Sequence, residues 1–83
     1  MKGRVVHVNQ HRGMVAVLTE DEEYSIIELL GDDVEVGDVL RWKGDYPLGG
    51  ETIRNLTQGI SIEVFFQNHS VPQHQLRQQL LYD

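Results

Sequence analysis

Two valine-rich segments joined by a short polar turn open the chain, and they constrain its fold more than any other feature. Residues 4–8 and 14–19 are rich in β-branched side chains, which favour an extended backbone. The polar segment between them ends in Arg12 and Gly13, and a glycine there can take the positive φ of a tight hairpin turn. The pattern predicts an antiparallel hairpin at the start of a mainly β domain.

Further short strands are predicted along the chain, separated by turns rich in glycine and acidic residues. We expect them at residues 24–30, 39–43, 51–57 and 60–66. Short strands at this spacing are typical of a closed or nearly closed β-barrel. The first 57 residues are therefore predicted to form the barrel, and residues 58–83 an added strand and helix within the same single domain.

The end of the chain has the pattern of a short helix, predicted over residues 71–81. Ser70 and Gln73 match a capping box, and Pro72 lies where its missing N–H costs little. So short a helix is not stable alone in water. Its apolar stripe, which includes Leu76 and Leu80, should therefore pack on the barrel or on another subunit.

Composition narrows the classes of function. The chain has 83 residues and no cysteine, which excludes a disulfide framework and a thiolate metal site. No apolar run is long enough to span a bilayer, and the N-terminal segment lacks the apolar region of a secretion signal. We expect a soluble cytoplasmic domain without membrane contact.

The charge is negative overall and unevenly placed. A net charge of −6 argues against a general polyanion binder, because phosphate binding is driven by Lys and Arg. Residues 1–19 nevertheless carry three bases and no acid, whereas residues 20–38 carry nine acids and no base. We expect a mildly basic face and a strongly acidic, solvated set of loops.

Five short segments, taken in order, resemble the cold-shock domain, a small OB-fold that binds single-stranded RNA and DNA. Residues 3–9 are similar to its G-K-V-K-W-F-N strand, residues 12–17 to K-G-F-G-F-I, and residues 25–29 to V-F-V-H-F. Residues 35–39 are similar to its E-G-Q-x-V turn, and residues 52–57 to its closing Q-A-A-N-V-T. The resemblance implies a small OB-like five-stranded barrel that binds single strands.

The aromatic residues of those segments are replaced in this chain. Where the family has its binding rings, this sequence has His7, Val8, Met14, Ala16, Ile26 and Leu29. Each base stacked on an aromatic ring contributes about 1–3 kcal/mol, so losing several rings lowers affinity a thousandfold or more. High-affinity binding in the family's usual mode is therefore not expected.

Two interpretations of the replaced face remain open. In the first, a weak single-stranded RNA or DNA site survives on a basic edge, with candidate residues Arg4, His7, Arg12, Arg41, Lys43 and Tyr46. In the second, the aliphatic face is covered by the C-terminal segment or by a partner protein or second copy. The candidate residues of that interaction surface are Val8, Met14, Ile26, Phe65, Leu76 and Leu80.

Other chemistry finds little support in the sequence. His7 and His11 have the spacing of helical metal ligands but fall in a strand and its turn, so we expect no metal site. No serine has a recognisable nucleophile motif, and no glycine-rich phosphate loop is present. We expect no enzyme and no cofactor.

Trp42 is expected to pack in the barrel, and Tyr46 to be the more exposed ring. The predicted function is weak single-stranded nucleic-acid binding, with protein interaction or dimerisation as the alternative.

Overall fold

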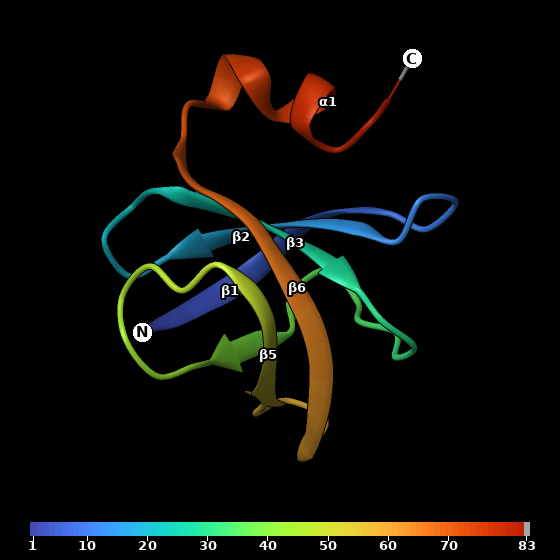
Figure 1. Cartoon of the computed structure of the whole chain (residues 1–83), viewed down its shortest axis with the longest axis vertical. Coiled ribbons are helices and arrows are strands. Elements are labelled where there is room, and N and C mark those ends of the chain that lie inside the picture. Colours follow the sequence, from blue (N-terminus) through green and yellow to red (C-terminus); the bar gives the residue numbers. More distant parts are fainter. Residues whose placement is uncertain (83) are drawn as a thin grey trace.

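Six antiparallel strands close into a barrel in the computed structural model, which describes residues 1–82 (Figure 1). The strands are β1 (Lys2–Asn9), β2 (Met14–Thr19), β3 (Tyr24–Leu29), β4 (Val39–Arg41), β5 (Gly49–Asn55) and β6 (Ile60–Val71). Their order around the barrel is β1-β2-β3-β6-β5-β4, and β4 pairs with β1 to close it. The predicted mainly β barrel with a short C-terminal helix is confirmed. The last strand is part of the barrel wall, because β6 pairs with both β3 and β5.

The barrel interior is filled by aliphatic side chains from all six strands around one aromatic pair. Val5, Val15, Ile27 and Leu40 are fully buried there. Trp42 is 5% exposed and meets Phe66 edge to face, with ring centroids 5.1 Å apart. The expected packing role of Trp42 is therefore confirmed.

A β-bulge in β1 changes which of its side chains face inward. The register with β2 shifts between Val5 and His7. As a result Val5 and the half-buried Val8 both belong to the barrel interior, while Val6 faces the other way. Placing Val8 on the replaced outer face was therefore wrong, because uninterrupted alternation does not hold across a bulge.

The C-terminal segment, residues 71–82 and called the tail below, contains less helix than expected, and the strand before it is longer than expected. A 3₁₀ turn, η1 (Gln73–Gln75), leads into one turn of helix, α1 (Leu76–Gln79). Neither has a side-chain N-cap, so the capping-box prediction was wrong. The Ser70 hydroxyl instead donates to Glu23 Oε2 at 2.8 Å, because β6 continues through Val71.

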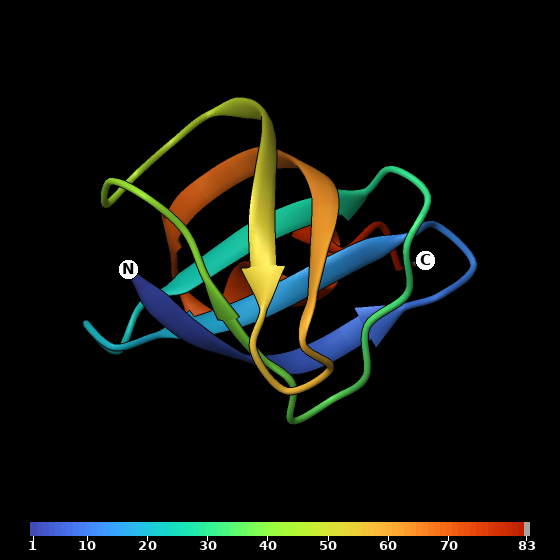
Figure 2. The same ribbon diagram turned by 90° about the horizontal axis from the view of Figure 1, so that it is seen from below.

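This tail lies across the outer face of β1, β2 and β3 and forms a second apolar cluster there. Met14, Ala16 and Ile26 from the sheet meet Val71, Leu76 and Leu80, and all six are at most 5% exposed. The amide of Asn9 donates to the carbonyl of Leu80 at 2.8 Å within the same buried region. Figure 2 shows the tail behind these strands, with β4 and β5 in front.

Candidate nucleic-acid interface

The outer face of β2 and β3, where the family resemblance places the binding platform, is not open. Met14, Ala16 and Ile26 are buried beneath Leu76 and Leu80. The aliphatic side chains at these positions therefore pack against the tail of the same chain. With the tail in place, no base reaches this part of the sheet.

Cationic side chains gather on a different part of the barrel wall, where β1, β4 and β5 meet. Strand pairing places Lys2 opposite Arg41, and Arg41 opposite Arg54. All three residues are exposed and alternate with buried neighbours, so their side chains point outward. Neighbouring strands lie about 4.8 Å apart, which makes these cations direct neighbours.

Two further bases extend this row into a basic face. Arg4 follows Lys2 on β1, and Lys43 follows Arg41 after a single intervening residue, with both side chains exposed. We define the basic face as Lys2, Arg4, Arg41, Lys43 and Arg54, which is five of the seven Lys and Arg residues in the chain. Within residues 1–82 none of these five takes part in an ion pair. The tail lies on the other side of the barrel from β4 and β5 (Figure 2).

A shallow depression of about 290 Å³ lies within the basic face. Its lining combines three of the cations with hydroxyl groups and one carboxylate, contributed by Arg41, Trp42, Lys43, Glu51, Thr52, Ile53, Arg54 and Ser61. The guanidinium of Arg54 donates to the hydroxyl of Ser61 at 3.2 Å, which holds the arginine over β6. Guanidinium, ammonium and hydroxyl groups are the donors that commonly contact phosphate oxygens.

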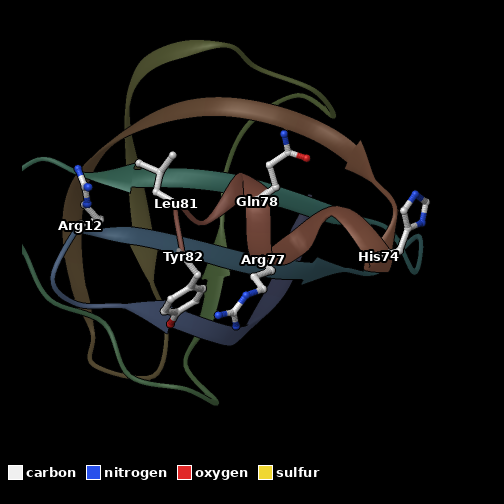
Figure 3. Close-up of a pocket in the computed structure, with 6 residues that line it drawn as sticks. All are labelled: Arg12, His74, Arg77, Gln78, Leu81 and Tyr82. Carbon is white, nitrogen blue, oxygen red and sulfur yellow. The ribbon is translucent and has the colours of Figure 1, made fainter.

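Two further candidates of the predicted edge, His7 and Arg12, lie away from this face or at its margin. His7 is exposed further along β1, beyond the bulge. Arg12 is exposed in the turn between β1 and β2, and it lines a depression beside the end of the tail (Figure 3). The predicted set is therefore divided, with Arg4, Arg41 and Lys43 on the basic face and Arg12 beside the tail.

Tyr46 is exposed as expected, but its surroundings are acidic. Its side chain is 54% exposed and meets the ring of His69 edge to face at 5.6 Å. The negative charges of Glu23, Asp21 and Asp45 raise the pKa of the Tyr46 phenol above its ordinary value of 10.0. Because the same charges repel phosphate, Tyr46 is poorly placed to help bind a polyanion.

His69 fixes the loop that carries Tyr46. The ring of His69 stacks on Phe66, with centroids 5.3 Å apart, and its Nδ1 is 2.8 Å from the hydroxyl of Ser25. Its Nε2 donates to the carbonyl of Pro47. A carbonyl only accepts, so the proton of a neutral ring is on Nε2 and Ser25 donates to Nδ1. These contacts fasten the loop to the barrel.

The residues proposed for a protein-interaction surface have different environments. Met14, Ile26, Leu76 and Leu80 pack against one another inside the molecule. Phe65 is 40% exposed on β6, on the opposite face of that strand from the buried Val64 and Phe66. The set therefore does not form one accessible surface while the tail is docked.

Lys2 and Arg54 are the members of the basic face that sequence reasoning missed. Alternation alone indicates that both point outward from their strands. Their proximity depends on the pairing of β1 with β4 and of β4 with β5, between residues about forty and thirteen positions apart. No local signal in the sequence specifies that register.

Within the part of the chain that the structure describes, no group of three or more histidine or acidic side chains has an arrangement suited to a metal ion. Among residues 1–82 no helix is long and apolar enough to cross a membrane. No family model, curated protein or solved structure matches this chain.

Proposed function

We propose that this protein is a small non-enzymatic module that binds single-stranded nucleic acid weakly through the basic face. The observation that carries the proposal is the row of Lys2, Arg41 and Arg54 on three adjacent strands. Like charges directly opposite each other destabilise a sheet. Three adjacent cations that form no ion pairs among the described residues repel one another and so destabilise the folded state. A bound polyanion would offset this repulsion.

Binding on this face differs in kind from stacking on an aromatic platform. Side chains of the basic face contact backbone phosphates and displace counterions, and this interaction carries little sequence preference. Three to five phosphate contacts to a single strand give a slope of log K against log salt of about −2 to −3.5. The net charge of −6 opposes association, so we expect a dissociation constant on the order of 10⁻⁴ M at physiological salt.

Fluorescence anisotropy of labelled short oligouridine and oligothymidine, measured at low and at physiological salt, tests the proposal. The double variant Arg41→Gln, Arg54→Gln removes two cations of the row. It should weaken binding several-fold and flatten the salt slope by about 1.4, or about 0.7 for each lost phosphate contact.

A matched control separates the basic face from net charge. Asn68 and Gln73 are exposed and lie outside the face, so the double variant Asn68→Asp, Gln73→Glu changes net charge by the same amount. Binding by the control variant should stay close to that of the unmodified protein. Equal weakening by both double variants, or no binding at low salt, contradicts the proposal.

The alternative, a protein-interaction or dimerisation module that uses the tail, requires Leu76 and Leu80 to leave the cluster in which they are buried. An oligomeric state that changes with concentration, and that Leu80→Asp abolishes without unfolding the barrel, would favour it.

A further inference from the structure

The tail brings an exposed aromatic ring to the turn that carries Arg12. An open depression of about 540 Å³ lies there, lined by Arg12, His74, Arg77, Gln78, Leu81 and Tyr82 (Figure 3). Its volume is within the range typical of small-molecule sites. The depression is formed by segments more than sixty residues apart in the chain, so it exists only when the tail is docked.

The ring of Tyr82 is held in a defined orientation. Its hydroxyl donates to the carbonyl of Val8 at 3.0 Å, and the guanidinium carbon of Arg77 lies 5.8 Å from the ring centroid. Figure 3 shows both side chains extending from the tail toward β1. Tyr82 nevertheless remains 42% exposed. A ring fixed in this way loses little conformational entropy when a flat ligand stacks on it.

Arg12 supplies positive charge from the other side of the depression. Its position is set by the turn, because its backbone N–H donates to the carbonyl of Asn9 at 3.2 Å and the Gly13 carbonyl accepts from Leu29 at 2.8 Å. Its side chain is exposed, and Gln78 adds an amide that can both donate and accept hydrogen bonds. The depression therefore combines an aromatic face, a cation and an amide.

We propose that this depression binds one nucleotide, with the base stacked on Tyr82 and the phosphate at Arg12. Aromatic stacking of bases and guanidinium contacts to phosphate are the two interactions that such a surface provides. The ring absent from the sheet of the barrel is thereby supplied by the tail that covers it. This site lies apart from the basic face and does not rest on the function proposed for it.

Residue-resolved NMR of the full chain, titrated with AMP, adenosine or ribose 5-phosphate, tests the site. AMP should shift the amide signals of residues 12 and 77–82, and should bind more tightly than adenosine or ribose 5-phosphate. Shifts confined to other residues would overturn the proposal. Equal shifts from ribose 5-phosphate and AMP would also overturn it, because binding would then not require a base stacked on the Tyr82 ring.

Two variants at one position separate stacking from tail docking. Tyr82→Phe keeps the ring and removes the hydrogen bond to Val8, so most AMP binding should remain. Tyr82→Leu removes the ring and should weaken AMP binding at least about fivefold. Unchanged binding by Tyr82→Leu contradicts the proposal, and the signals of Met14 and Ile26 show whether the tail is still docked.

A further pair of measurements distinguishes this site from the basic face and identifies the source of the nucleotide. Arg12→Gln should reduce the AMP-induced shifts of residues 77–82 more than Arg54→Gln does. A short oligoadenylate with a 5′-phosphate is then compared with AMP at the Arg12 and Tyr82 signals. Stronger shifts from the oligonucleotide indicate a strand end, and equal shifts indicate a free nucleotide. AMP binding altered by Arg54→Gln but not by Arg12→Gln would overturn the assignment.

Discussion

At the scale of single residues, the Asp38 side chain joins two segments of the barrel, residues 35–38 and residues 55–58. Its side chain is 4% exposed, and Oδ2 accepts from Asn55 Nδ2 at 2.9 Å, Gln58 Nε2 at 2.8 Å and the Glu35 N–H at 3.0 Å. Burial raises the pKa of Asp38, but hydrogen bonds from Asn55, Glu35 and Gln58 outweigh it, and the pKa lies below its ordinary 3.8. The ionised carboxylate therefore stabilises the fold.

Asp38→Asn should lower the free energy of unfolding by about 1–3 kcal/mol at neutral pH. The amide would place either a nitrogen, which cannot accept, or an uncharged oxygen, which accepts more weakly, at the position of Oδ2. A group with a lowered folded-state pKa contributes stability above its unfolded-state pKa and loses it as pH falls through the folded value. The difference between the two proteins should thus narrow below pH 3.8. Urea unfolding at neutral and acidic pH measures it, and a pH-independent difference contradicts the argument.

Gly3 leaves no room for a side chain between β1 and β2. A Cβ atom there would lie 2.4 Å from Val17 Cγ1 and 3.1 Å from the Leu18 carbonyl oxygen, and Val17 is fully buried. Gly3→Ala should therefore destabilise the protein by about 1–3 kcal/mol through overpacking. At Gly50, also in a strand, a Cβ atom would have open space around it for 4 Å. Gly50→Ala should change stability by less than about 0.5 kcal/mol. Thermal unfolding compares the two, and similar melting temperatures would refute the steric account.

At the scale of elements, the tail owes its position to apolar contacts with β2 and β3. Leu80 is 1% exposed and lies against the cluster that contains Met14, Ala16 and Ile26. One turn of helix is not stable without such contacts. The tail is therefore best regarded as part of the fold, held in place by the face that it covers.

Leu80→Ala should cost about 2–5 kcal/mol, because it removes buried methyl groups and leaves a cavity under the tail. Leu81, its neighbour, is 49% exposed and serves as the control. Leu81→Ala should change stability by no more than about 0.5 kcal/mol. Equilibrium unfolding in urea gives both values, and equal losses would show that burial does not distinguish these positions.

At the scale of the whole molecule, the barrel interior and the tail cluster lie on opposite faces of the same strands. Val15 and Ile27 point into the barrel, while Met14 and Ile26, adjacent to them in sequence, point to the tail. Because both clusters are built on the same strands, disrupting one also destabilises the other. A domain of 83 residues buries too little apolar surface for either cluster to be stable alone.

We expect a single cooperative unfolding transition. Trp42 is the sole tryptophan and is buried beside Phe66, so its fluorescence reports on the barrel interior, while far-UV circular dichroism reports on the strands. The two signals should have the same midpoint in urea. Separate midpoints would indicate that parts of the molecule unfold independently.

The succession of strands along the chain and the existence of a terminal helix follow from local patterns, and both were predictable. The hairpin of β1 and β2 was predictable because its β-branched residues and its glycine turn lie within a few positions of each other. The ends of β6 and α1 were not, because Ser70 matches a capping pattern yet bonds to Glu23 across the sheet. Competition between a local cap and a distant acceptor is settled only in the folded chain.

The sequence by itself determined a small β-barrel and the presence of a terminal helix, because periodicity and residue type are local properties. For the face that carries Met14, Ala16 and Ile26, it left two interpretations open, a weak nucleic-acid site or an aliphatic surface covered by the tail or a partner. Only the tertiary structure decided what covers that face and where the cations meet. Lys2, Arg41 and Arg54 become neighbours through strand pairing, and Tyr82 and Arg12 line one depression only because the tail docks. Such contacts between distant residues depend on register and packing, which no single segment encodes.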